Sequence, residues 1–518
     1  MRRTLLSILA AAVSGVLWGL SFGRLPVWLP PLLSSVALVP LLVALRRTTG
    51  PKLPWFLGWI FGLCAWITGI PWIVYTLQNY GGLPKALSMV LLAGLAGFLG
   101  LYFALVAALG ARFLRSGHTL LALLGVPAAF VGMEWAQSWL FGGFPWNLGA
   151  YTWIDVPGAL PLSAWIGAWG VTFVVVMVNT GLALSFTPDS VNRRWQPAAG
   201  VLATAGALCL FGWATAVPGS TGSDASSGLP VRLLQPNVEN AIVPDWQEIR
   251  RNYDRVFDLS RDACDARGAL LVWPESAVWP YELEAPERHH RQFRHDLDAL
   301  IGRGCPVILN SPHYSDHGEL FNSAFLLTPE GTLDRYDKRE LVPWGERIPL
   351  KEILPFVGKL ARNAGEFTPG ETVGLLPVGE EQLAMAICFE SAFPSLVAES
   401  VAQGATLLGT ISNDAWYGDS AARTQLFQAV RYRAAENRRP LIRAAITGIT
   451  AVVGPDGSVR QRLPMDEMGV LSATVSGRHQ RSLFSRAPWA VPVLCWLLVL
   501  GLLVRSFVGR RGAPPEPR

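Results

Sequence analysis

Long apolar runs dominate the first 217 residues of the chain, and short polar loops separate them. Each run contains about 20 residues, which is the length that a helix needs to cross the hydrocarbon core of a bilayer. One more apolar run follows a long polar stretch near the C-terminal end. The pattern therefore predicts eight transmembrane helices, near residues 4–22, 26–45, 54–78, 86–111, 119–141, 158–186, 196–217 and 488–508.

Between the seventh and the eighth apolar run, the pattern changes to that of an α/β domain. Short apolar runs of strand length, such as 231–237 and 306–314, alternate with amphipathic helical patterns such as 246–268 and 421–439. The stretch 321–338 is typical of a β-hairpin, with its turn at Pro-Glu-Gly. At about 260 residues, the segment is long enough to form a hydrophobic core of its own.

These changes of pattern predict five parts along the chain. A stretch rich in glycine and serine separates the apolar region from the α/β pattern and is typical of a flexible linker. The predicted parts are a seven-helix transmembrane region (1–217), the Gly/Ser linker (218–228), the α/β domain (229–485), an eighth transmembrane helix (486–508) and a short tail (509–518).

Basic residues gather on one side of the predicted membrane topology. Short loops rich in lysine and arginine stay in the cytoplasm, so their positions give the orientation. With eight crossings, both termini are predicted to be cytoplasmic and the α/β domain to be exported. The basic residues that share the cytoplasmic side are Arg2, Arg3, Arg46, Arg47, Lys52, Arg112, Arg115, Arg193, Arg194, Arg505, Arg510 and Arg511.

The composition agrees with a membrane protein and excludes some partners. Hydrophobic residues make up 51% of the chain and charged residues 16%, whereas soluble domains carry about 25% charged residues. The net charge of +5 does not come with a long basic run, so we exclude nucleic acid as a partner. Six cysteines without paired Cys/His spacing indicate no zinc site. A Cys264–Cys305 bridge stays open as an alternative if the domain faces an oxidising compartment.

Four predicted strands end in polar or reactive residues, and active sites form where the strands of open α/β sheets end. Glu275, Lys338 and Cys388 supply a base, a positive charge and a thiol nucleophile, which are the groups that acyl transfer needs. Asn413 follows the fourth strand. Each residue alone also has a structural interpretation, because a buried cysteine is usually an inert small hydrophobe and a lone charge is usually solvated.

Taken together and in order, these residues carry a resemblance. The strings WPES around Glu275, YDKRELVPWGE around Lys338 and ICFE around Cys388 resemble the signatures of the carbon-nitrogen hydrolase (nitrilase) superfamily. With the transmembrane pattern, FPWNLGAY (144–151) and SNDAWYG (412–418), the chain resembles the apolipoprotein N-acyltransferase branch of that superfamily. The resemblance implies an α-β-β-α sandwich for the α/β domain, attached to the polytopic α-helical membrane domain.

The resemblance also implies the roles of the site residues. Glu275 would be the general base, Lys338 would stabilise the oxyanion, and Cys388 would be the acylated nucleophile. Further residues would assist or bind substrate: Glu346, Glu390, Phe389, Trp246 and Asn413. The family often has tyrosine where this chain has Phe389, so an aromatic ring or a backbone N–H is what that position keeps. Glu390 would face the same cleft as Cys388 if the strand continued, whereas a turn directly after Cys388 would change this.

The function that the resemblance implies is the last step of bacterial lipoprotein maturation. Cys388 would take an acyl chain from a membrane phospholipid as a thioester and pass it to the N-terminal diacylglyceryl-cysteine of an apolipoprotein. The expected location is the inner membrane, the expected state is a monomer, and no metal or cofactor is implied. The alternatives are a membrane-tethered amidase or nitrilase acting on a small soluble amide, and a non-catalytic lipoprotein-binding module.

Two further features have open interpretations. The amphipathic stretch 347–367 is typical either of a lid on the outer leaflet or of a helix packed on the domain. Glu134 and Gln137 lie near the outer end of the fifth predicted span, where a buried carboxylate needs a partner. Either a structural hydrogen bond or contact with a lipid headgroup accounts for Glu134.

Overall fold

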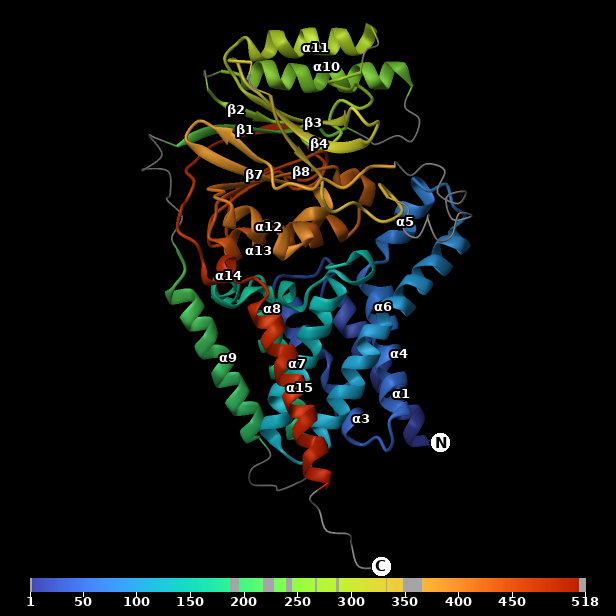
Figure 1. Cartoon of the computed structure of the whole chain (residues 1–518). Coiled ribbons are helices and arrows are strands. Elements are labelled where there is room, and N and C mark those ends of the chain that lie inside the picture. The colour runs from blue at the N-terminus through green and yellow to red at the C-terminus, as the bar shows by residue number, and fades with distance from the viewer. Residues whose placement is uncertain are drawn as a thin grey trace, which may run out of the picture. The chain divides into compact units, whose positions relative to one another are not determined.

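The computed structural model describes residues 2–186, 195–217, 228–238, 245–265, 268–285, 288–331, 333–347 and 366–511. The chain divides into two compact units (Figure 1). The helical unit comprises Met1–Val74, Pro84–Ala216 and Ala487–Arg518, and the α/β unit comprises Tyr75–Leu83 and Val217–Arg486. The α/β unit therefore includes a short segment from between two membrane helices.

The helical unit is a bundle of apolar helices. Small residues let its helices approach closely, as bilayer packing favours. A Cβ atom at Gly58 or Gly62 of α4 would collide with the backbone of α6. The helices are α1 (Arg2–Leu20), α2 (Leu29–Ala37), α3 (Val39–Arg46), α4 (Lys52–Gly69), α6 (Lys85–Leu114), α7 (Thr119–Gln137), α8 (Ala159–Ser185), α9 (Gln196–Ala214) and α15 (Ala490–Arg511), with short 3-10 turns at Leu140–Gly142 and Gly149–Trp153. Helix α5 (Trp72–Asn79) begins in this unit and lies mostly in the α/β unit.

The predicted count of eight spans is not confirmed. Among the described residues, six helices are long and apolar enough to cross a membrane, taking α2 and α3 as one, and a bent pair raises the number to seven. That pair is α4 and α5, which meet at 59°. The prediction of one continuous helix over 54–78 is therefore wrong, because Pro71 lacks the N–H that would continue it. The described apolar part of α15, Ala490–Arg505, is not among these helices, so the span expected over 488–508 stays a prediction.

The loop 142–158 is held at the end of α7 by hydrogen bonds of Glu134 and Gln137, the two polar residues noted in the sequence. Glu134 accepts a hydrogen bond of 2.7 Å from the backbone N–H of Gly149. Gln137 donates one of 2.8 Å to the carbonyl of Phe144. Of the two interpretations of Glu134, the structure therefore supplies the structural hydrogen bond.

The α/β unit contains two six-stranded sheets. The first has the order β12-β1-β2-β3-β4-β5 and the second the order β11-β10-β9-β8-β7-β6. Strands β1 to β3 and strands β7 to β9 are parallel, and hairpins extend both sheets. The strands are β1 (Leu229–Gln235), β2 (Leu270–Val272), β3 (Val307–Tyr314), β4 (Leu320–Leu327), β5 (Leu333–Asp337), β6 (Leu375–Val378), β7 (Glu381–Ile387), β8 (Leu407–Ser412), β9 (Leu441–Ala445), β10 (Ala451–Val453), β11 (Val459–Arg462) and β12 (Gly469–Val475).

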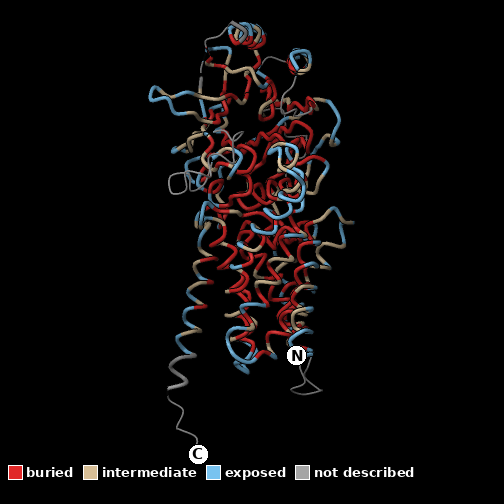
Figure 2. Tube along the Cα trace, turned by 90° about the vertical axis from the view of Figure 1, so that its right-hand side faces the viewer, coloured by how far each residue is buried: buried red, intermediate tan, exposed pale blue. Residues whose placement is uncertain are grey.

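Helices cover the outer face of each sheet and complete an α-β-β-α sandwich. Figure 1 shows α10 and α11 beside the first sheet, and α12 and α13 beside the second. Strands β7 and β8 are buried along most of their length, and Figure 2 shows buried residues throughout the interior of each unit. The helices are α10 (Trp246–Ala263), α11 (Arg288–Ile301), α12 (Pro394–Ala402), α13 (Ala422–Asn437) and α14 (Leu483–Arg486). The predicted fold class and the hairpin over 321–338 are confirmed.

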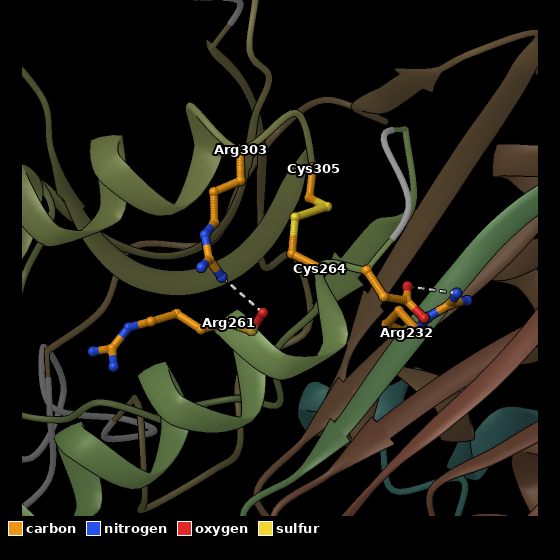
Figure 3. Close-up of a disulfide and its surroundings, with 6 residues drawn as sticks. Arg232, Arg261, Cys264, Arg303 and Cys305 are labelled. Atoms are coloured by element: carbon orange, nitrogen blue, oxygen red, sulfur yellow. Dashed lines mark hydrogen bonds and ion pairs between the residues drawn. A yellow bond between two sulfur atoms is a disulfide. The ribbon is translucent and has the colours of Figure 1, made fainter.

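Helix α10 illustrates how the sequence forms the first layer. Asp245 caps its first turn by accepting a 2.7 Å hydrogen bond from the N–H of Glu248. The apolar face of α10, including Phe257, packs into the hydrophobic core that the helix shares with the first sheet. At the other end, Cys264 forms a disulfide with Cys305, which joins α10 to the start of β3 (Figure 3). The bridge that the sequence left open is present.

Two predicted segments lie outside the described residues. They are nearly the whole linker 218–228 and most of the proposed lid 347–367. The linker and the lid therefore stay predictions from the sequence.

Candidate active site

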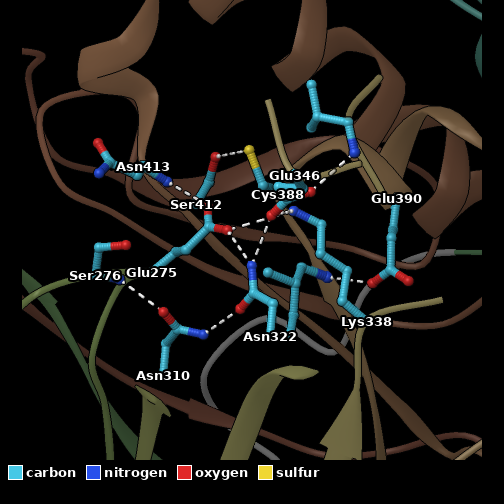
Figure 4. Close-up of polar contacts among 12 residues, drawn as sticks. Glu275, Ser276, Asn310, Asn322, Lys338, Glu346, Cys388, Glu390, Ser412 and Asn413 are labelled. Atoms are coloured by element: carbon cyan, nitrogen blue, oxygen red, sulfur yellow. Dashed lines mark hydrogen bonds and ion pairs between the residues drawn. The ribbon is translucent and has the colours of Figure 1, made fainter. Parts of the chain in front are cut away.

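Three predicted catalytic residues lie together where strands of the two sheets end (Figure 4). Glu275 follows β2, Lys338 follows β5 and Cys388 follows β7. Their exposed fractions are 5%, 1% and 5%. Charged side chains are rarely buried this deeply unless they are paired, so the cluster needs internal partners.

Lys338 pairs with two carboxylates. Its Nζ atom lies 2.8 Å from Oε1 of Glu346 and 3.4 Å from Oε1 of Glu275. Burial alone would lower the pKa of Lys338, but the charges of the two glutamates outweigh burial and raise the pKa above its ordinary value. The lysine is therefore a fixed positive charge in a site that excludes water.

Two asparagines, which the sequence analysis missed, hold these carboxylates. Nδ2 of Asn322 lies 3.2 Å from Oε1 of Glu275 and 2.7 Å from Oε1 of Glu346. Asn310 donates a 2.7 Å hydrogen bond to Oδ1 of Asn322 and accepts one of 3.0 Å from the N–H of Ser276. Both asparagines lie within strands, β3 and β4, that also contain other polar residues, so the local sequence pattern does not set them apart.

The backbone of Asn413, which follows β8 of the second sheet, completes the surroundings of Glu275. The N–H of Asn413 donates a 3.1 Å hydrogen bond to Oε2 of Glu275. The side chain of Asn413 instead accepts a 3.2 Å hydrogen bond from the N–H of Ala415 and thereby caps the 3-10 turn Asp414–Tyr417. Asn413 therefore reaches the base through its backbone, and its side chain shapes the loop.

Cys388 lies at a sharp turn at the end of β7. Its φ of +53° falls in the left-handed region, which residues with a Cβ atom rarely adopt and which is often found at active sites. The strand ends at Ile387, and a 3-10 turn, Cys388–Ala392, follows at once. The thiol Sγ lies 3.4 Å from Oγ of Ser412 and 4.0 Å from Oη of Tyr417.

The thiol is protonated at neutral pH. Burial, together with the charge of Glu275, raises the pKa of Cys388 to about 12, although Lys338 acts in the opposite direction. Lys338 therefore offsets the effects of burial and of the Glu275 charge only in part. A base must remove the thiol proton during attack, since no standing thiolate is available.

Glu390 does not continue on the strand face of Cys388, because the chain turns directly after the thiol. Its Oε1 accepts hydrogen bonds of 2.6 Å from the N–H of Arg339, 3.1 Å from the N–H of Glu340 and 2.8 Å from the hydroxyl of Tyr336. Its Oε2 accepts one of 2.7 Å from the N–H of Ile387. Glu390 therefore fastens the turn at the nucleophile to the chain that follows Lys338.

A second buried pair, also missed by the sequence analysis, lies behind the thiol. Nη2 of Arg443 lies 2.9 Å from Oδ1 and 2.8 Å from Oδ2 of Asp414 in an ion pair, and both side chains are fully buried. The hydroxyl of Ser412 donates a 2.5 Å bond to Oδ1 of Asp414. Ser412 thus connects this ion pair to Cys388.

The two aromatic candidates occupy different surroundings. Phe389 is buried and packs edge-on against Phe393, with 5.1 Å between the ring centroids. Trp246 begins α10 and is 68% exposed, and the hydrogen bonds described for the cluster do not include it. The roles of both in substrate binding stay predictions. Among the described residues, no group of three or more histidine, cysteine, aspartate or glutamate side chains is arranged to hold a metal ion.

Comparison with known proteins agrees with this arrangement. Residues 14–181 match the apolipoprotein N-acyltransferase N-terminal domain, and residues 231–481 match the carbon-nitrogen hydrolase family. The apolipoprotein N-acyltransferase of Geobacter metallireducens is 34% identical over 507 residues, covering 96% of this chain and 94% of that protein.

The chain belongs to the apolipoprotein N-acyltransferase family. The Photobacterium profundum member is 31% identical over 90% of this chain and 89% of its own length. An amidase of Nesterenkonia sp. AN1 has a solved structure that is 21% identical, covers 52% of this chain and 99% of that one, and has a TM-score of 0.38. As a member of the apolipoprotein N-acyltransferase family, the protein is an enzyme with a membrane-embedded helical part.

Proposed function

We propose that this enzyme acylates the amino group of the N-terminal diacylglyceryl-cysteine of apolipoproteins, with a membrane phospholipid as acyl donor and Cys388 as the acylated nucleophile. The observation that carries the proposal is the buried cluster of Glu275, Lys338 and Cys388 in a chain that matches this family over nearly its full length. The cluster supplies a base, a positive charge and a thiol at one place.

In the first half-reaction, Glu275 takes the proton of the Cys388 thiol while Sγ attacks the ester carbonyl of the phospholipid, on its sn-1 chain. The ammonium of Lys338, which has three N–H donors and two carboxylate partners, stabilises the developing oxyanion. The C–O bond breaks, and the lysophospholipid oxygen receives the proton from Glu275. The product is a thioester on Cys388.

In the second half-reaction, the amine of the apolipoprotein attacks the thioester carbonyl and transfers a proton to Glu275. The C–S bond then breaks, and the proton from Glu275 returns to the Cys388 sulfur. An N-acylated lipoprotein and free enzyme result. The burial of Cys388 suits these two half-reactions, because water would otherwise hydrolyse the thioester.

We further propose that the enzyme lies in the bacterial inner membrane as a monomer, with both termini in the cytoplasm and the α/β unit in the periplasm. The distribution of basic residues in the loops supports this orientation. The Cys264–Cys305 disulfide also supports it, since disulfides persist in oxidising compartments.

Intact-protein mass spectrometry tests the proposal on the full chain in lipid nanodiscs. After incubation with phospholipid, we expect the wild-type mass to increase by one acyl chain and neutral hydroxylamine to remove the increase. Cys388→Ala should show no adduct, whereas Cys209→Ala, which removes another free cysteine, should behave as wild type. Addition of a diacylglyceryl-cysteine peptide should discharge the adduct onto the peptide amine.

Three outcomes contradict the proposal in different ways. Acylation of the lipopeptide by Cys388→Ala would show that the thiol is not the nucleophile. An adduct that forms from a small amide but not from phospholipid would favour the amidase interpretation. Lipopeptide binding without any turnover in the wild type would favour the binding module.

A further inference from the structure

The segment Tyr75–Leu83 is separated in sequence from the rest of the α/β unit, yet it belongs to that unit. It contains most of α5 and the turn that follows it, between the break at Pro71 and the start of α6. Nothing in the mechanism above uses it.

The segment contacts the loop that carries SNDAWYG. The hydroxyl of Thr76 donates a 3.0 Å hydrogen bond to the carbonyl of Trp416, which lies 340 residues further along the chain. The hydroxyl of Tyr80 donates one of 2.9 Å to the carbonyl of Ala415. The rings of Tyr80 and Trp416 also pack, with 4.4 Å between their centroids.

Gly418 shows how close this approach is. A Cβ atom at Gly418 would collide with the ring of Tyr75, and its φ is +54°. Only glycine fits a backbone that is both left-handed and pressed against an aromatic ring. The loop and the segment are therefore shaped to each other over consecutive residues.

Residues of the same loop also contact Glu275 and Cys388. Asn413 holds Oε2 of Glu275 through its N–H at 3.1 Å, and Oη of Tyr417 lies 4.0 Å from Sγ of Cys388. The two carbonyls that Thr76 and Tyr80 hold, those of Trp416 and Ala415, lie between these two residues in the sequence. Any shift of the loop therefore changes the positions of the base and of the thiol's neighbour together.

We propose that Thr76 and Tyr80 are positioning residues for the reaction, which hold the Asn413–Gly418 loop so that Glu275 and Cys388 keep their relative geometry. This inference deepens the proposed function and rests on it for the identity of the reaction. The two residues do not touch the reacting atoms. They act through the backbone of the loop, so their loss lowers the rate of thioester formation more than it weakens phospholipid binding.

The test uses full-length variants in lipid nanodiscs. Thr76→Val and Tyr80→Phe each remove one hydroxyl and keep the shape of the side chain. We expect each to lower the rate of Cys388 acyl-adduct formation at saturating phospholipid by about fivefold, which corresponds to one net hydrogen bond. Thr76→Ser should restore the rate. Tyr314→Phe, which removes an exposed hydroxyl from the same unit, is the matched control.

A second measurement distinguishes positioning from general loss of structure. Loosening the loop relieves part of the burial of Cys388, so its pKa should fall from about 12 and its alkylation by iodoacetamide should become faster at pH 9. We expect acylation to slow and alkylation to accelerate in the Thr76→Val/Tyr80→Phe double variant, with a melting temperature like that of Tyr314→Phe.

The outcomes are separable from those of the proposed function. A folded double variant that matches the wild type in both rates overturns the inference. If the wild type itself forms no adduct, the proposed function fails, while the alkylation rates of the double variant still decide whether the segment positions the thiol.

Discussion

The carboxylate of Glu275 has two opposing effects on Cys388. In the proposed mechanism it accepts the thiol proton, and as a negative charge it raises the pKa of that thiol. A protonated nucleophile beside its base is the resting state that proton transfer during attack requires. Lys338 pairs with both Glu275 and Glu346.

Glu275→Gln separates these two effects. We expect thioester formation to slow by about 10²-fold to 10⁴-fold, because the general base is lost. Iodoacetamide should nevertheless alkylate Cys388 faster at a given pH, because the charge that raised its pKa is gone. Stopped-flow alkylation and the mass-spectrometric adduct assay measure the two rates.

Lys338→Met is the opposite control for Glu275→Gln. The positive charge of Lys338 lowers the pKa of Cys388, so its removal should slow alkylation. If both variants changed alkylation in the same direction, the charge of Glu275 would not be what governs the thiol.

The sequence predicts a residue of this site when the position of that residue on its own strand marks it. Glu275, Lys338 and Cys388 are recognisable because each follows a strand end. Asn322 and Arg443 are not, because their roles come from packing between distant strands. Of the two positions that the sequence left open for Glu390, the structure has the one after a turn, since the left-handed backbone of Cys388 ends the strand at Ile387.

Among the secondary-structure elements, α10 and β3 show how the outer layer of the α/β unit is fixed. The Cys264–Cys305 disulfide connects the end of the helix to the start of the strand and closes a loop with a sequence separation of 41 residues. The labelled residues around the bridge in Figure 3 are different from the site residues labelled in Figure 4. Its contribution should therefore be to stability and not to chemistry.

Replacing both cysteines tests that separation. The Cys264→Ser/Cys305→Ser variant should lose about 4 kcal/mol of unfolding free energy by the chain-entropy estimate for such a loop. At a temperature where the variant is still folded, thioester formation should proceed at the wild-type rate. Thermal unfolding and the adduct assay check the two statements, and a variant that is stable but inactive would contradict them.

At the scale of the whole chain, two sequence patterns predicted the two units. The length of the apolar runs predicted the helical unit, and the alternation of strand and helix patterns predicted the α/β unit. The hydropathy pattern could not show the break between α4 and α5, because Ile70 and Pro71 are apolar and the run continues through them. It also could not show that the residues after the break join the α/β unit, since that depends on contacts with a loop far along the chain.

The membrane orientation is testable in intact cells with single introduced cysteines. Position 317 lies in an exposed turn of the α/β unit, and position 116 lies in the exposed turn between α6 and α7. A membrane-impermeant maleimide should label His317→Cys from the periplasm and should label Ser116→Cys only after the inner membrane is opened. Labelling of both in intact cells, or the reverse pattern, would contradict the orientation.

The depth of Cys388 has a consequence for the lifetime of the enzyme. If the α/β unit lies in the periplasm as proposed, its free thiol is exposed to oxidants, and oxidants react with the thiolate. A thiol with a pKa of about 12 ionises too rarely to be an easy target, so the surroundings that delay its ionisation also protect it from oxidation.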